Sequence, residues 1–319
     1  MRFGLERLII MKKLSLAITI LLALATFSFG QTAQEFLNRG IQNYKNKQYT
    51  EAITNFNQAI KLSPNAPTPW FNRGQAYFYS GRIDLAIADY SQVIKLDSKY
   101  LDALFQRGLA YNRTKNHDLA IADYSNGISL APNDSQFWYN RGIAQYDKGN
   151  LEYAFADYNQ AIKLNPNYMK AYVNRGSVYY KQKKYDLAIA DLNSALKLDS
   201  NNPEAWGNRG MCYSALNQID LAIADFNQAI KVDASYAKGY LDRGIAYNKK
   251  KQNDLAIADL NQAIKINPNY MGAYLMRGAI YFDSKRYDLA KIDMEKVLQL
   301  SPNQKLATDV LAKIAVLPK

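Results

Sequence analysis

The sequence is nearly free of the two residues that build most cross-links and many metal centres. Its 319 residues include one cysteine, Cys212, and one histidine, His117. A single cysteine excludes an intramolecular disulfide and any metal cluster held by cysteines, and a lone histidine leaves no second imidazole to share an ion. We therefore expect neither a disulfide framework nor a bound metal.

An apolar run of modest length lies near the N-terminus, at residues 14–27. Two lysines precede it, and small residues follow it at Ser28 and Gly30. This order is typical of a secretory signal peptide, here with its cut before Gln31. The run is shorter than the ~20 apolar residues that span a bilayer comfortably. We expect residues 1–30 to be a signal peptide and the protein to be exported, to the periplasm or as a secreted protein.

The residues after the expected cut support it. Thr32 and Glu35 have the spacing of a capping box, so a helix is predicted to begin where the leader ends. Two alternatives stay open, a true start at Met11 and an uncleaved leader. An uncleaved leader would anchor the protein in the membrane.

From Ala33 onward the sequence repeats every 34 residues, without insertion or deletion, over eight cycles. A glycine marks the same point of each cycle, and an alanine follows it twelve residues later. The glycines are Gly40, Gly74, Gly108, Gly142, Gly176, Gly210, Gly244 and Gly278. Such a period predicts a row of identical structural modules, which we call repeats and number by position from Ala33.

Each repeat is predicted to hold two helices joined by a short turn. In the second repeat, Trp70 and Tyr77 flank the glycine at a spacing that places both rings on one helical face. The second helix begins with Asp84 and ends with Lys95, charges that the helix dipole favours at those ends. A single helix pair cannot bury these aromatic rings, so the repeats are expected to stack on one another.

The tryptophan, glycine, tyrosine and alanine positions resemble the 34-residue pattern of the tetratricopeptide repeat family. The resemblance implies an all-α fold, a right-handed α-solenoid of eight tandem helix–turn–helix repeats within residues 31–304, closed by a capping helix at 305–319. In the capping helix, Leu306, Val310 and Ile314 are predicted to form one apolar stripe. The predicted repeats are residues 33–66, 67–100, 101–134, 135–168, 169–202, 203–236, 237–270 and 271–304.

One departure from the family recurs, an arginine at position 7 of every repeat where leucine is usual. A ladder of arginines could form a track for anions. Seven repeats also carry an aspartate at position 23, and the first carries Asn55 there. Because the two charges cancel, we favour bidentate ion pairs that hold the repeat together. The predicted pairs include Arg73 with Asp89, Arg107 with Asp123, Arg141 with Asp157, and Arg175 with Asp191.

The resemblance implies that the first helices line a concave groove for an extended peptide or a partner's helix. In some members of the family, an asparagine ladder at position 6 bonds the backbone of a bound peptide, as a carboxamide can because it both donates and accepts. Here the ladder would be Asn38, Asn72, Gln106, Asn140, Asn174 and Asn208, ending before Asp242 and Met276. Neighbouring aromatic candidates are Phe71, Phe105, Tyr139, Phe78, Tyr146 and Tyr180. The alternative is that these asparagines are polar groups on a solvated face.

A further recurrence is leucine at position 19 of six repeats. We expect these side chains to pack between repeats, and the alternative is an exposed apolar stripe. The leucines are Leu85, Leu119, Leu187, Leu221, Leu255 and Leu289.

No catalytic arrangement emerges from the sequence. Every repeated glycine lies within a helix, so these glycines form no loop that could hold a phosphate, and His117 and Cys212 occupy packing positions. We therefore predict no catalytic residue and no cofactor, and a non-enzymatic scaffold that binds a protein or peptide. The alternatives are a membrane-anchored assembly factor and, because the net charge is +12, a binder of anionic polymers. Nucleic acid is not an expected partner, because acidic residues interleave with the basic ones.

Overall fold

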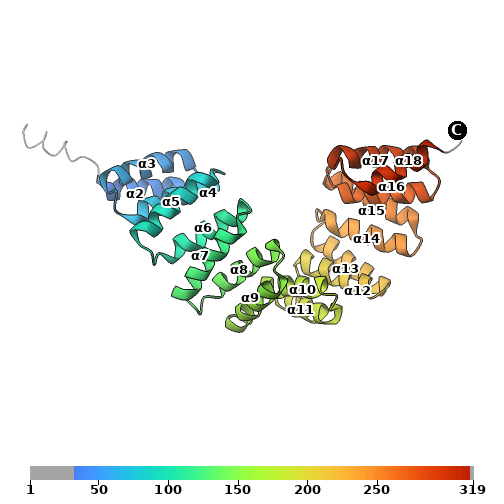
Figure 1. The fold of residues 1–319 in the computed structure, drawn as a ribbon, viewed down its shortest axis with the longest axis horizontal. Helices are drawn as coiled ribbons and strands as arrows, with labels where there is room; N and C mark the ends of the chain where they lie inside the picture. The colour runs from blue at the N-terminus through green and yellow to red at the C-terminus, as the bar shows by residue number, and fades with distance from the viewer. Residues whose placement is uncertain (1–31, 317–319) are drawn as a thin grey trace, which may run out of the picture. The chain divides into compact units, whose positions relative to one another are not determined.

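The structure is a computed structural model that describes residues 32–316 (Figure 1). Within these residues the secondary structure consists of seventeen α-helices and no strand. The predicted signal peptide lies outside the described residues. Among residues 32–316, no helix combines the length and apolar character that crossing a bilayer requires.

The described residues form two compact bodies, divided after Leu130. The N-terminal body contains α2 (Ala33–Lys45), α3 (Tyr49–Leu62), α4 (Pro67–Tyr79), α5 (Ile83–Leu96), α6 (Leu101–Arg113) and α7 (His117–Leu130). The C-terminal body begins with α8 (Ser135–Lys148), α9 (Leu151–Leu164), α10 (Met169–Lys181), α11 (Tyr185–Leu198), α12 (Pro203–Ala215) and α13 (Ile219–Val232). It continues with α14 (Ala237–Lys249), α15 (Asn253–Ile266), α16 (Met271–Asp283), α17 (Tyr287–Leu300) and α18 (Lys305–Ala315).

In both bodies each repeat is a helix pair, and within a body each helix packs on the next along the chain. First helices of successive repeats also touch, as α10 touches α12 and α12 touches α14. The all-α solenoid expected from the sequence is therefore confirmed.

Helix α2 begins at a complete capping box, in which Thr32 Oγ1 accepts from the Glu35 amide and the Glu35 carboxylate accepts from the Thr32 amide.

The repeated glycine is the point where the two helices of a repeat come closest. A Cβ atom on Gly74 would lie 2.7 Å from the ring of Tyr90, and one on Gly142 would lie 2.6 Å from the ring of Tyr158. Both rings are fully buried, so they have no room to withdraw. Glycine at this position lowers helix propensity, but its lack of a Cβ atom leaves room for an aromatic ring between the two helices.

The turn between the two helices of a repeat uses a left-handed residue at position 15. Gly81 and Gly149 fill this position in two repeats, with φ of 83° and 90°. The other six repeats hold a residue with a side chain there, at φ of 59–61°: Lys47, Lys115, Lys183, Asn217, Lys251 and Lys285. Glycine adopts such angles without the steric cost that a Cβ atom brings, so these six turns are strained.

Two packing predictions are wrong. The position 19 leucines do not pack between repeats, because each is 37–51% exposed; their neighbour at position 20 faces the core instead. In α18 the buried face is formed by Ala307 and Val310, joined by Leu311 and Ile314, whereas Leu306 is exposed. In both cases the exposed leucine stands one residue before a fully buried alanine, at position 20 in the repeats and at Ala307 in α18.

Candidate functional site

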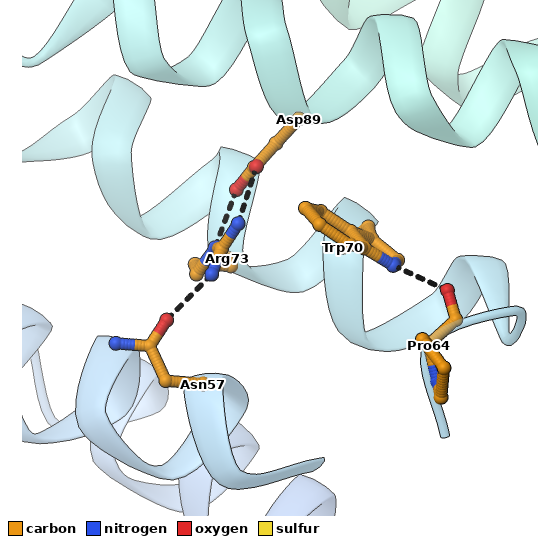
Figure 2. A network of polar contacts seen from close by, with 5 residues as sticks. All are labelled: Asn57, Pro64, Trp70, Arg73 and Asp89. Carbon is orange, nitrogen blue, oxygen red and sulfur yellow. Dashed lines mark hydrogen bonds and ion pairs between the residues drawn. The ribbon is translucent and has the colours of Figure 1, made fainter. Parts of the chain in front are cut away.

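The arginine at position 7 is held from three sides, as Figure 2 shows for Arg73. Its Nε and Nη2 donate to the two carboxylate oxygens of Asp89 at 2.8 and 2.7 Å. Its Nη1 donates to Asn57 Oδ1 at 2.6 Å, and its guanidinium lies 4.7 Å from the centre of the Trp70 ring. Because Asn57 belongs to the preceding repeat, the arginine joins two repeats as well as the two helices of its own.

The same bidentate contact recurs in seven repeats of the described chain, always across 16 residues. It joins Arg73 to Asp89, Arg107 to Asp123, Arg141 to Asp157, Arg175 to Asp191, Arg209 to Asp225, Arg243 to Asp259, and Arg277 to Asp293. These arginine side chains are only 16–21% exposed. The hydrogen bonds to Asp123 raise the pKa of Arg107, as expected for a charge-assisted pair. We call this arrangement the arginine clamp.

The first repeat carries the arginine without the clamp. Arg39 is exposed, and Asn55 stands at the aspartate position. The Asn55 side chain donates instead to Asn43 Oδ1 at 3.1 Å. Comparison of the first repeat with the other seven can therefore show what the clamp contributes to stability.

A row of three adjacent hollows lies along the first helices of the C-terminal body. Hollow A, of about 200 Å³, lies between α8 and α10; hollow B, of about 340 Å³, and hollow C, of about 210 Å³, continue it over α12 and α14. Tyr146 lines both A and B, and Tyr180 and Met211 line both B and C. Neighbouring hollows thus share lining residues and follow one another along the first helices, and we call this row of hollows the groove.

Four of the residues predicted from the sequence come together in this groove. Asn174 lines hollow A, and its Nδ2 donates to the Tyr139 hydroxyl at 3.2 Å. Asn208 lines hollow B, where its Nδ2 lies 3.4 Å from Ser177 Oγ. Tyr146 and Tyr180 form the walls described above. The groove therefore combines carboxamides with phenol rings along the first helices.

Other predicted residues lie elsewhere. Asn140 is buried, and its Nδ2 donates to the Gln136 carbonyl of its own helix at 2.8 Å. Tyr139 packs on Tyr168 with ring centres 4.6 Å apart, and it lines a further hollow of about 250 Å³ together with Asn174 and Glu204. Tyr139 is thus partly a packing residue and partly a surface one.

In the N-terminal body the predicted residues are more occupied by local contacts. Asn72 Nδ2 donates to the Thr68 carbonyl, and the exposed Asn38 accepts from Gln34. Gln106 is half-buried on α6. Phe71 packs on Tyr90 and Tyr100, Phe105 packs on Tyr124, and Phe78 lies under the guanidinium of Arg113. Packing between helices and repeats accounts for much of this aromatic surface.

Family models agree with the repeat pattern. A TPR repeat model matches residues 42–81, 74–115, 144–183 and 244–285, and two tetratricopeptide repeat models match 101–134, 170–202, 203–236 and 272–304. The chain belongs to the tetratricopeptide repeat (TPR) family. TPR folds are typically non-catalytic scaffolds that bind protein or peptide partners.

Solved TPR structures share this fold at low sequence identity. A chain of the APC/C hetero-tetramer Cut9-Hcn1 is 18% identical with a TM-score of 0.66, over 88% of this chain and 55% of that one. A tetratricopeptide repeat protein from Parabacteroides merdae is 19% identical with a TM-score of 0.66, over 78% of this chain and 98% of that one. Yeast Tom70 is 16% identical with a TM-score of 0.62, over 90% of this chain and 64% of that one. The chain thus spans about half of the Cut9-Hcn1 chain. A search of curated proteins gave no significant match.

The two residues that are rare in this TPR chain have structural places. Cys212 is buried, and burial raises the pKa of its thiol to about 12, so it stays protonated and unreactive at neutral pH. His117 begins α7 and is half-buried, with Nδ1 at 3.4 Å from Asn112 Oδ1. Residues 32–316 contain no group of three metal-binding side chains.

Proposed function

We propose that this TPR protein is an exported, non-catalytic scaffold that binds an extended peptide, or a partner's helix, in the groove of its C-terminal body. The observation that carries the proposal is the row of adjacent hollows A, B and C, which share lining residues over four successive first helices. Neighbouring packed helices are about 8–10 Å apart, so four of them offer a track of roughly 25–30 Å. An extended chain rises about 3.3 Å per residue, and the track therefore suits a segment of about eight residues.

The chemistry of the groove suits a peptide backbone. The carboxamides of Asn174 and Asn208 can both donate and accept, the pair of functions that a peptide unit requires. One N–H of each already bonds within the protein, to Tyr139 and to Ser177, so a peptide would use the second N–H and a free lone pair of the oxygen. Tyr146 and Tyr180 add rigid rings with a polar tip, which supply contact area at little entropic cost. Such a surface recognises the main chain and leaves side-chain preferences to the individual hollows.

The arginine clamp weighs against the alternative of an anionic-polymer binder. Each of the seven clamp arginines already donates two N–H groups to its aspartate, and Arg73 donates a third to Asn57. Positive charge at the groove comes instead from Lys181, Lys238 and Lys249. Peptide binding should therefore depend weakly on salt, whereas polymer binding should fall steeply with it.

Selection from a displayed library of random dodecapeptides tests the proposal. We expect selected peptides to bind the wild-type protein, and the substitutions Asn174→Ala and Asn208→Ala to weaken each by about 5–10-fold, the worth of one net hydrogen bond. Leu187→Ser on the exposed side of α11 is the matched control and should leave the affinity unchanged. Equal affinity of both asparagine variants and the wild type would sink the proposal.

Export is a separate part of the proposal and rests on residues 1–30 alone. N-terminal sequencing of the protein isolated from the cell envelope and the medium decides it. A chain that begins at Gln31 supports a cleaved leader, and an intact leader in the membrane fraction supports the anchored assembly factor instead.

A further inference from the structure

Asp242 places a carboxylate where the earlier repeats of the groove carry a carboxamide. It lies at position 6 of α14, lines hollow C, and its side chain is 12% exposed. Its Oδ2 is buried and has no hydrogen-bond partner within residues 32–316. A buried carboxylate oxygen without a hydrogen bond is energetically costly, and such a group in a native protein calls for an explanation.

The nearest cation, Lys238, forms only a long ion pair with this carboxylate and no hydrogen bond. Lys238 Nζ is 3.9 Å from Oδ2, beyond hydrogen-bond distance, and lies 3.3 Å from Asn208 Oδ1 instead. Lys249 also lines hollow C, but its amine bonds Ser214 at both the hydroxyl and the carbonyl, at 3.0 and 3.2 Å. Lys249 is exposed and Lys238 is 38% exposed, so water screens both charges more than it screens the buried carboxylate.

The other walls of hollow C suit the stem of a long cationic side chain. Tyr180, Met211 and Ile245 supply an aromatic ring, a thioether and an aliphatic chain. A guanidinium or ammonium group that reached Asp242 would place its methylene groups against these residues and lie near the face of a phenol ring. The other titratable groups that face Asp242 are the phenols of Tyr180, Tyr236 and Tyr270, which are uncharged at neutral pH.

From this geometry we propose that hollow C is a subsite for a lysine or arginine side chain of the bound peptide, with Asp242 as the counter-ion. The proposal rests on the proposed function, because it assigns one side chain of the same extended ligand. It explains why the carboxamide ladder changes to an acid at α14: this position would read a side chain, whereas Asn174 and Asn208 bind the main chain.

The test compares Asp242→Asn with the wild type, and Asp220→Asn is the matched control. Asp220 is 84% exposed and pairs with Lys250, so its change removes the same charge outside the groove. The probes are peptides selected by the wild-type protein, resynthesised with each lysine replaced by norleucine and each arginine by citrulline. Isothermal titration gives the affinities, and the replacement of lysine and of arginine distinguishes ammonium from guanidinium recognition.

We expect the wild type to bind one cationic position at least tenfold more tightly than its neutral replacement, and Asp242→Asn to lose this preference while Asp220→Asn keeps it. An equal preference in Asp242→Asn and the wild type would overturn the subsite and leave the peptide-binding proposal intact. If no peptide binds at all, titration with n-butylguanidinium and n-butylammonium still tests the subsite. Binding of either ion by the wild type and not by Asp242→Asn supports it, and equal behaviour of the two proteins overturns it.

Discussion

Removal of the Arg73 side chain should destabilise the N-terminal body far more than removal of Arg39. The two residues hold the same position in adjacent repeats, but only Arg73 has the clamp. Arg73→Ala leaves the Asp89 carboxylate, which is buried, without its cation. Breaking a buried ion pair from one side costs about 3–5 kcal/mol, because the remaining charge cannot be solvated.

Other contacts of Arg73 add to this cost. The hydrogen bond to Asn57 and the stacking on Trp70 are also lost, and a cation–π contact contributes about 0.5–2 kcal/mol. We expect a total of about 5–6 kcal/mol for Arg73→Ala. Arg39→Ala removes an exposed side chain whose one aromatic contact is a long one, 5.8 Å from the centre of the Phe36 ring, and it should change the free energy of unfolding by less than about 1 kcal/mol.

Urea denaturation followed by circular dichroism at 222 nm measures both variants. Because Arg73 also bonds the preceding repeat, its loss should reduce the slope of the transition as neighbouring repeats unfold more independently. The double variant Arg73→Leu with Asp89→Leu distinguishes the contribution of the ion pair from that of side-chain packing. Replacing both charged groups by apolar ones should cost much less stability than the sum of the two single changes. Equal stability of Arg73→Ala and Arg39→Ala would refute the clamp as a stabilising element.

Three further predictions follow from single residues. Asp242→Asn should stabilise the protein at pH 8, because burial raises the carboxyl pKa of the wild type from 3.8 to about 6. At 1.36 kcal/mol per pKa unit, ionisation of this carboxyl lowers the free energy of unfolding of the wild type by up to about 3 kcal/mol as the pH rises from about 4 through 6. Thermal unfolding should show that advantage shrink towards pH 4, and an advantage independent of pH would contradict it. Gly142→Ala should destabilise by about 1–2 kcal/mol, because overpacking against Tyr158 outweighs the gain in helix propensity; a more stable variant in urea would contradict this. Lys183→Gly should raise stability in urea by about 0.5–1 kcal/mol by relieving its left-handed turn, and a loss would show that the turn is unstrained.

The sequence predicts the repeat fold well because the 34-residue period never shifts. Each glycine, aromatic and alanine position is sampled eight times, so the helix pairs follow from spacing alone, whereas the contact of Gly74 with the Tyr90 ring emerges only from the structure. The arginine clamp is visible for the same reason, as two opposite charges at a fixed offset on two helices. What the sequence leaves out of the clamp is the third contact, to Asn57 of the preceding repeat.

The candidate site is harder to predict, because periodicity assigns a residue to a helical face without saying what covers that face. Asn140 and Asn174 share position 6, yet Asn140 bonds its own helix and is buried while Asn174 lines hollow A. The leucines at position 19 show the same limit, because their periodicity predicts packed side chains whereas the structure leaves them exposed. The burial of Asp242 depends on its neighbours in α10 and α12, and the acid at position 6 is the only signal of it in the sequence.

Photo-cross-linking of a selected peptide locates its binding site most directly. The photoreactive residue p-benzoylphenylalanine replaces Tyr146 or Tyr180 in the groove, or Leu187 or Leu221 on the exposed side of the second helices. Groove binding predicts that the peptide is captured by the variants at Tyr146 and Tyr180 and not by those at the leucines. Capture at Leu187 and Leu221 alone would contradict the proposed binding site and assign the partner to the second-helix face.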